Sequence, residues 1–197
     1  MLKKMSHNPL TTNYIMRLLP QNLEAKSILD CACGYGIWGF NIRIKFQETP
    51  QLIGFDIFKP YVDKLKKLKI YDQVFHADIL NIPFPDNSFD VVLAAEVIEH
   101  LNKKDGYQMM QEVERVAKDL IIITTPEGWH KQGSYDKNKY QMHRSGWKVK
   151  EFENEGYKVI TYDKQELTRL LKFIEKIRRF IFRLDKNKGI IAFKKKL

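Results

Sequence analysis

Residues 28–39 read Ile-Leu-Asp-Cys-Ala-Cys-Gly-Tyr-Gly-Ile-Trp-Gly, and this stretch decides the fold of the 197-residue chain. An apolar run of strand length ends in an acid, Asp30, and then turns through Gly34 and Gly36. In Rossmann-like folds such a glycine loop presents backbone N–H groups to a pyrophosphate. A carboxylate at Asp30 would repel a phosphate and attract a cation. The stretch therefore predicts a positively charged ligand.

Acids also follow the next strand-like segments. Asp56 ends residues 52–56, at the spacing from the glycines that ribose recognition requires, and Asp78 and Glu96 follow residues 73–77 and 89–94. A solvated strand end explains any one of these acids, but the carboxyl ends of parallel strands meet at one edge of a sheet. The acids are expected to converge on one crevice. S-adenosylmethionine suits it, because this nucleoside carries an ammonium and a sulfonium and no phosphate.

Apolar segments of strand length alternate with helical patterns along the chain, which is typical of a sheet built from βαβ units. We predict an α/β fold, with a Rossmann-like, doubly wound, seven-stranded and mostly parallel sheet and helices on both faces. One domain is expected over residues 1–197, with a helical cap at 1–24. Strands are predicted at 27–32, 52–56, 73–77, 89–94, 119–125, 157–162 and 189–193, and helices at 11–19, 37–46, 60–68, 104–117 and 148–155.

In these motifs the chain resembles the class I S-adenosylmethionine-dependent methyltransferases. The resemblance implies that Asp56 binds the ribose and Asp78 the adenine of the cofactor. The cofactor contacts that it implies are Asp30, Ala32, Cys33, Gly34, Gly36, Asp56, Ile57, Asp78, Ile79 and Ala95. Cys31 and Cys33 lie in the strand-to-loop turn, where their side chains are expected to point to opposite faces, which argues against a disulfide. A redox or metal role for them and simple burial beside the cofactor both remain open.

The chemistry is expected at Glu96-Val-Ile-Glu99-His100. If this segment is helical, Glu96, Glu99 and His100 share one face, and such a set invites Mg²⁺ or Mn²⁺. The alternative is a capped helix with a substrate-orienting acid and a general-base histidine. His143, in the long loop at 126–146, is a fourth candidate ligand or a histidine bonded to nearby backbone. The aromatic residues Trp129, Tyr135, Tyr140 and Trp147 either frame an acceptor pocket or pack locally.

Two metal-assisted branches of the family share this element. The Glu-x-x-Glu-His pattern resembles the O-methyltransferases of ubiquinone biosynthesis and, together with His143, the enzymes that methylate the terminal ribose 2′-hydroxyl of small RNAs. In both, the resemblance implies a cation that acidifies the acceptor hydroxyl. We predict O-methylation of a small-molecule, sugar or lipid-linked hydroxyl, with His100, Glu96 and His143 as catalytic candidates. An RNA ribose 2′-O-methyltransferase and a catalytically silent S-adenosylmethionine-binding scaffold are the alternatives.

The C-terminal part is strongly basic. Residues 164–197 contain twelve Lys or Arg and three Asp or Glu, whereas the whole chain has a net charge of +10. An amphipathic helix is predicted at 164–184, inserted before the last strand, and its basic face fits plain solvation, an anionic membrane or lipid-linked substrate, or nucleic acid. The chain shows no apolar stretch of membrane-spanning length and no signal peptide, so a cytoplasmic location with peripheral membrane contact through this helix is expected.

Overall fold

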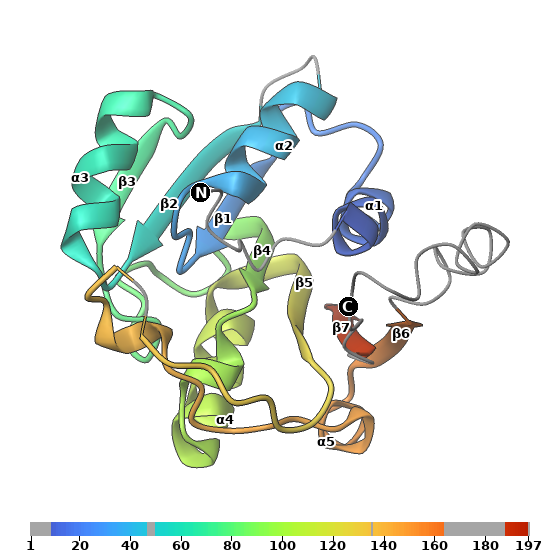
Figure 1. The fold of residues 1–197 in the computed structure, drawn as a ribbon. Helices are drawn as coiled ribbons and strands as arrows, with labels where there is room; N and C mark the ends of the chain where they lie inside the picture. The colour runs from blue at the N-terminus through green and yellow to red at the C-terminus, as the bar shows by residue number, and fades with distance from the viewer. Residues whose placement is uncertain (1–8, 47–49, 135, 164–187, 197) are drawn as a thin grey trace, which may run out of the picture.

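A computed structural model of the chain describes residues 9–46, 50–134, 136–163 and 188–196. Its centre is a seven-stranded sheet in the order β3-β2-β1-β4-β5-β7-β6 (Figure 1). Strands β1 to β5 are parallel, and β7 runs antiparallel to both β5 and β6. The strands are β1 Ser27–Cys31, β2 Gln51–Asp56, β3 Gln73–His76, β4 Phe89–Ala95, β5 Ala117–Pro126, β6 Lys158–Asp163 and β7 Lys188–Lys195. The predicted fold class is confirmed.

Helices cover both faces of this sheet, as predicted (Figure 1). Apolar side chains of α1, α2 and α3 pack in one core cluster, and those of α4 and α5 pack in the other. The helices are α1 Pro9–Leu18, α2 Ile37–Lys45, α3 Lys59–Leu68, α4 Lys103–Val116 and α5 Val149–Asn154, with short 3-10 helices η1 Ile98–His100 and η2 Lys139–Gln141. Pro60 lies in the first turn of α3, where its missing N–H is not needed.

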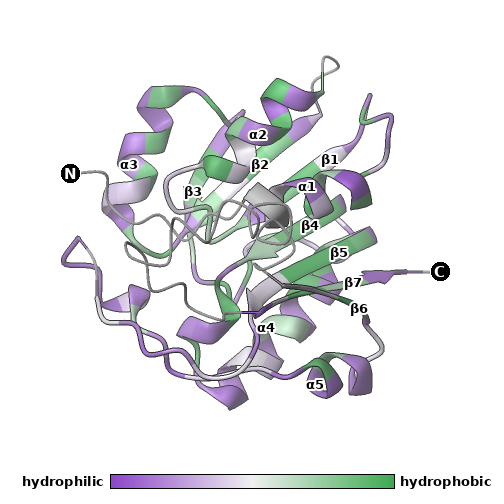
Figure 2. Cartoon of the chain, turned by 45° about the vertical axis from the view of Figure 1, so that its right-hand side comes forward, coloured by the Kyte–Doolittle hydropathy of each residue, from purple (hydrophilic) through white to green (hydrophobic). Residues whose placement is uncertain are grey.

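Strand β5 is apolar on both faces because both faces are covered. Ile121 and Ile123 belong to the α4 side of the core, whereas Leu120 and Ile122 belong to the α1 side. Figure 2 shows this strand as a hydrophobic band inside the sheet. β5 pairs with β4 on one side and β7 on the other, so it is an interior strand of the sheet.

Three further predictions concern the ends of the chain and the cysteines. Within the predicted cap at 1–24, helix α1 contacts α2 and β7. The predicted basic helix at 164–184 lies outside the described residues. Cys31 and Cys33 are free and buried, one in each core cluster, as expected for residues on opposite faces. Among the residues that the structure describes, no helix has the length and hydropathy needed to span a bilayer.

The order of the strands reverses between β1 and β4, where the chain crosses from one half of the sheet to the other. In open α/β sheets the ligand crevice lies outside the carboxyl ends of the strands at this switch point. The glycine loop after β1 and the segment after β4 both begin there, so the topology brings the predicted site residues to one edge of the sheet.

Candidate active site

The backbone N–H groups of the glycine loop after β1 form hydrogen bonds within the protein. The amide of Cys33 donates to the Phe55 carbonyl at 2.9 Å, the amide of Gly34 donates to Oδ2 of Asp56 at 2.9 Å, and that of Gly36 donates to the Cys33 carbonyl at 2.8 Å. A loop that binds pyrophosphate needs such amides for the ligand. Here three of these amides are bonded within the protein, one of them to a carboxylate.

The loop is held in a left-handed conformation at several positions. Ala32 has φ 53°, Gly34 has φ 53° and Gly36 has φ 79°. A Cβ atom at Gly36 would lie 2.6 Å from Cδ2 of Leu65 on α3, so a glycine is required there on both counts. A non-glycine residue in this region is strained, and such strain is frequent at functional sites. Glu96, directly after β4, shows the same feature with φ 55°.

Asp56 ties the end of β2 to the glycine loop. Besides the Gly34 amide, its carboxylate accepts a hydrogen bond of 2.7 Å from the Phe58 amide, through Oδ1. Burial raises the pKa of this carboxyl, and the two backbone donors oppose that shift. The side chain is 6% exposed, so its oxygens reach only a ligand seated directly on the loop. Its predicted contact with a ribose stays a prediction.

The structure corrects the prediction for Asp30. Its side chain is 1% exposed and accepts a hydrogen bond of 2.5 Å from the Tyr71 hydroxyl, so it does not face the ligand crevice. Burial raises the pKa of this carboxyl to about 7, with the hydrogen bond from Tyr71 acting in the opposite direction. The acid that bonds the backbone of the glycine loop is Asp56, whereas Asp30 bonds the Tyr71 hydroxyl inside the core.

The remaining predicted cofactor contacts lie at the ends of β2, β3 and β4. Asp78 is exposed and accepts a hydrogen bond of 3.0 Å from the Leu80 amide, whereas Ile79 and Ala95 are buried. The carbonyl of Ile57 accepts from the ring of His76 at 2.9 Å. All these residues follow carboxyl strand ends at the same edge of the sheet, but their contacts with a cofactor stay predictions.

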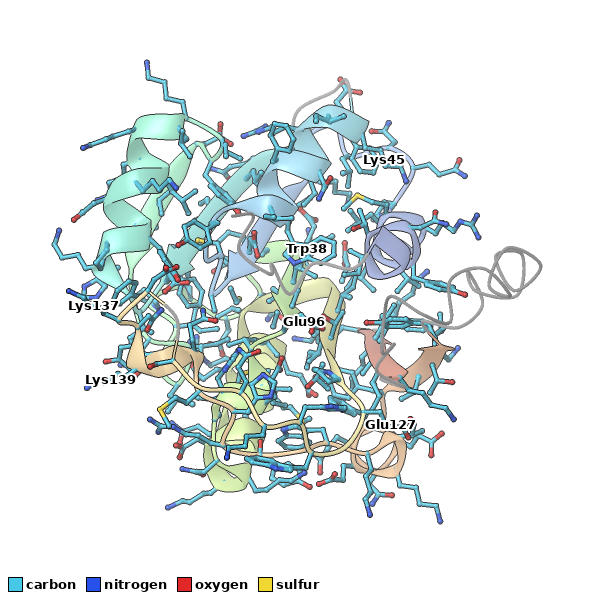
Figure 3. The ribbon with its side chains drawn as sticks, viewed as in Figure 1. Trp38, Lys45, Glu96, Glu127, Lys137 and Lys139 are labelled. Atoms are coloured by element: carbon cyan, nitrogen blue, oxygen red, sulfur yellow. The ribbon has the colours of Figure 1, made fainter. Side chains whose placement is uncertain are left out.

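The segment after β4 is not the regular helix that was predicted. The backbone of Glu96 has a left-handed conformation, and only Ile98–His100 form a helical turn, which is a 3-10 turn. Glu96 therefore does not share a helical face with Glu99 and His100. Instead, Oε1 of Glu96 accepts a hydrogen bond of 2.8 Å from the Thr124 hydroxyl on β5. Figure 3 shows Glu96 near the centre of the molecule. Among the described residues it is not part of the candidate metal cluster, which corrects its predicted role as a ligand.

Three of the four predicted metal ligands do come together. One ligand atom from each of Glu99, His100 and His143 lies within 4.8 Å of the others, and the two imidazole rings are 4.9 Å apart at their centroids. Glu99 is 3% exposed, and its Oε2 accepts from the Thr125 hydroxyl at 3.0 Å. Burial raises the pKa of this carboxyl to about 7. A buried carboxylate with two imidazoles fits a divalent cation or a proton-transfer site.

Both histidines are suited to accept a proton or to bind a metal. Nδ1 of His143 lies 2.6 Å from the carbonyl oxygen of His130, and because a carbonyl only accepts, Nδ1 carries the hydrogen and Nε2 keeps its lone pair. Nδ1 of His100 is buried and has no hydrogen-bond partner within the described parts of the chain. Burial lowers the pKa of both imidazoles, which keeps them neutral at pH 7.

The loop after β5, residues 127–148 and hereafter the β5 loop, is fastened to this cluster through backbone. The amides of Arg144 and Ser145 donate to the Glu99 carbonyl at 2.8 and 3.1 Å. Trp147 is fully buried and donates from its indole to Oγ of Ser145 at 2.9 Å, so it anchors the loop and does not frame a pocket. Trp129 and Tyr140 are exposed, and Tyr135 lies outside the described residues.

Sequence reasoning missed the residues whose hydroxyls bond three of the predicted carboxylates. Thr124 bonds Glu96, Thr125 bonds Glu99 and Tyr71 bonds Asp30. The two threonines end an otherwise aliphatic run, Leu-Ile-Ile-Ile-Thr-Thr, and adjacent hydroxyls at the carboxyl end of a buried strand are the feature that could have identified them. Tyr71 gives no such indication, because its partner is 41 residues away.

Comparison with known proteins finds similar sequences and similar structures. Residues 28–119 match a family described as a methyltransferase domain. An uncharacterized protein of Methanocaldococcus jannaschii is 29% identical over 150 residues, covering 73% of this chain and 61% of that protein. The demethylmenaquinone methyltransferase of Bacillus licheniformis is 31% identical over 98 residues, covering 48% of this chain and 41% of that protein. The chain thus spans about half the length of the curated relatives it matches.

Among solved structures, a putative methyltransferase from Bacillus halodurans has the same fold, with a TM-score of 0.66 at 14% identity, and the match covers 93% of this chain and 97% of that one. The described chain therefore shares the fold of this structure, and residues 28–119 match the methyltransferase-domain family. The β5 loop, which carries His143, lies beyond the matched residues.

Proposed function

We propose that the protein binds S-adenosylmethionine on the glycine loop and transfers its methyl group to a hydroxyl of a small-molecule, sugar or lipid-linked acceptor. The observation that carries this proposal is the hydrogen bond from the Gly34 amide to the Asp56 carboxylate. This bond occupies the Gly34 amide, which could otherwise donate to a phosphate, and it places the Asp56 carboxylate beside the loop. A nucleoside that carries positive charge and no phosphate fits this loop, whereas a dinucleotide does not.

His100 supplies the proton acceptor in this proposal. As the acceptor oxygen attacks the methyl carbon, the carbon–sulfur bond breaks, and the sulfonium becomes the neutral thioether of S-adenosylhomocysteine. The hydroxyl proton passes to the neutral imidazole of His100, whose low pKa keeps it unprotonated at pH 7. Because the sulfonium is already a good leaving group, alignment of the two substrates provides most of the rate.

The alternative role of this cluster is to bind a divalent cation, in which case the His100 nitrogen that binds the cation does not also accept the proton. Glu99, His100 and His143 would hold Mg²⁺ or Mn²⁺, and the unpartnered buried Nδ1 of His100 together with the fixed tautomer of His143 supports this assignment. Such a cation would lower the pKa of an acceptor hydroxyl. The residues of this chain that orient the ligand set are His130, through its carbonyl, and Thr125, through its hydroxyl.

A small acceptor is supported by a relative. The Bacillus licheniformis protein is named a demethylmenaquinone methyltransferase, which is a methyltransferase of a small molecule. The alignment with it covers less than half of each chain, so the acceptor of this protein is proposed by chemical class only.

The test is methyl transfer from labelled S-adenosylmethionine in a whole-cell extract, whose organic-soluble, RNA and protein fractions are separated and counted. We expect label in the organic-soluble fraction with the wild-type chain and its loss in His100→Ala. Label in the RNA fraction would favour the ribose methyltransferase instead. No label in any fraction, despite measured cofactor binding, would leave a binding scaffold as the function.

A further inference from the structure

The β5 loop folds back on itself next to the candidate site. The amide of His143 donates to the Gln132 carbonyl at 3.3 Å, and the side-chain amide of Gln132 donates to the Gln141 carbonyl at 3.0 Å. Together with the bond from the His143 ring to the His130 carbonyl, these contacts place residues 129–132 and 140–144 side by side. The exposed side chains of the two limbs therefore form one surface.

Side chains alternate along both limbs. The inward positions are polar and half-buried: His130, Gln132, Gln141 and His143. The outward positions are exposed and are aromatic, thioether or basic: Trp129, Lys131, Tyr140, Met142 and Arg144. Trp129 is 59% exposed, Met142 44% and Tyr140 37%. This is the reverse of an ordinary surface loop, which turns its large apolar side chains inward, so the outward face is shaped for contact.

The charge of this face has one sign. Every charged side chain that is exposed in the described part of the β5 loop is a cation, namely Lys131, Lys137, Lys139, Arg144 and Lys148. Figure 3 shows Lys137 and Lys139 at the outer rim of the molecule. The two acids of the loop, Glu127 and Asp136, are half-buried, and Asp136 accepts a hydrogen bond from the Tyr61 hydroxyl at 3.3 Å. The surface is thus basic and apolar together.

We propose that this outward face, made of Trp129, Lys131, Lys139, Tyr140, Met142 and Arg144, docks on an anionic lipid bilayer. Trp and Tyr side chains prefer the headgroup region, where the ring is buried and its polar edge stays hydrated, and nearby Lys and Arg bind acidic headgroups. Charge complementarity selects an anionic bilayer over a neutral one. Met142 favours lipid over nucleic acid, because acyl chains bury a thioether and a phosphate backbone does not.

The position of the face gives it a function. His143 projects inward from the limb whose neighbours, Met142 and Arg144, project outward, so a docked bilayer lies at the mouth of the candidate site. An amphiphilic acceptor would then enter from the membrane without crossing water. This last step rests on the proposed methyl transfer, whereas bilayer docking does not.

The test uses vesicles of phosphatidylcholine with and without an equal part of phosphatidylglycerol, added to the full chain. Trp38 and Trp147 are buried, so of the three tryptophans only Trp129 is available to respond. We expect a blue shift of the tryptophan emission with the anionic vesicles, a much smaller one with the neutral vesicles, and no shift in Trp129→Phe. An unshifted wild-type spectrum in the presence of bound vesicles would overturn the proposal.

A matched pair of charge reversals separates this face from the general positive charge of the chain. Because each cation near the surface contributes about 1 kcal/mol, Lys131→Glu with Arg144→Glu should weaken vesicle binding by at least about tenfold. Lys66→Glu with Lys67→Glu, on the exposed side of α3, removes the same charge and should weaken it less than about threefold. Equal effects of both pairs, or tighter binding of single-stranded RNA through the same residues, would contradict the proposal. Calorimetry with S-adenosylmethionine on the same variants shows separately whether the proposed function holds.

Discussion

The candidate site has two sides, the glycine loop and the β5 loop with its histidine cluster, and these two sides are built in opposite ways. On the side of the glycine loop, the backbone donors of Cys33, Gly34 and Gly36 are bonded within the protein, and the fold is fixed by close packing. On the side of the β5 loop, buried polar side chains cluster around a His100 nitrogen that has no partner among the described residues. After their proposed roles, we call the glycine-loop side the holding wall and the β5-loop side the reactive wall.

The largest expected effect is a loss of kcat in a variant that changes only the reactive wall. His100→Ala should lower kcat by about 10²- to 10⁴-fold, because a positioned proton acceptor contributes that much. The affinity for S-adenosylmethionine should change less than about threefold, since His100 is not part of the glycine loop. Steady-state kinetics and calorimetry on one preparation check both values.

His130→Ala is the control for this variant. The ring of His130 bonds the Glu127 carbonyl, and the variant keeps the backbone carbonyl that His143 uses. Its kcat should stay within about threefold of the wild type. A wild-type kcat in His100→Ala would show that His100 is not the proton acceptor.

The second largest effect is a loss of cofactor affinity in a variant of the holding wall. Asp56→Ala removes the acceptor of the Gly34 and Phe58 amides, and hydrogen bonds to a charged group contribute about 1.5–3 kcal/mol each. The loop should lose its fixed shape, and S-adenosylmethionine affinity should fall at least about tenfold in calorimetry. Asp63→Ala, which removes an exposed acid paired with Lys59 on α3, should leave the affinity unchanged. Equal losses in both variants would show that only net charge matters.

The third effect compares the packing of the two walls. A Cβ atom at Gly39 would lie 2.5 Å from Cζ of Tyr71, whereas one at Gly133 in the β5 loop meets nothing within 4 Å. Gly39→Ala should lower the free energy of unfolding by about 1–3 kcal/mol, because overpacking forces Tyr71 away from Asp30. Gly133→Ala should change it by less than about 0.5 kcal/mol. Urea denaturation measures the free energy of unfolding of both variants. An unchanged free energy in Gly39→Ala would mean that the holding wall is not tightly packed.

The smallest effect concerns pH at the reactive wall. The pKa of Glu99 is raised to about 7, and a metal binds the deprotonated carboxylate, so Mn²⁺ affinity should rise by about tenfold from pH 6 to pH 8. Glu99→Gln should bind Mn²⁺ weakly at both pH values. A pH-independent affinity in the wild type would exclude Glu99 as a ligand. Glu96→Gln is the control, because Glu96 lies outside the cluster, and it should keep the pH dependence.

The same contrast explains what the sequence could predict. Strand and helix positions follow from apolar periodicity, and β5 and α2 were predicted close to their observed bounds because their patterns are local. Asp56 could be placed at the glycine loop because strand ends in a parallel sheet share an edge. The holding wall is therefore largely readable from residues 28–119, which are also the residues that match the family.

The reactive wall depends on backbone geometry and on partners far along the chain. The left-handed φ of Glu96 turned a predicted helix into a single 3-10 turn and moved one of four predicted ligands away. The inward direction of Asp30 depends on Tyr71, and the position of His143 depends on amides of its loop bonding the Glu99 carbonyl. None of these contacts has a local pattern, so the sequence indicated three residues that do lie close together, but not how their side chains are arranged.

The most direct test of the central claim is calorimetry of the wild-type chain with S-adenosylmethionine and, separately, with NAD⁺. The account predicts one site for S-adenosylmethionine and no measurable binding of NAD⁺, because the Gly34 amide is bonded to Asp56 and is closed to a phosphate. Tight binding of NAD⁺ with no heat from S-adenosylmethionine would contradict it.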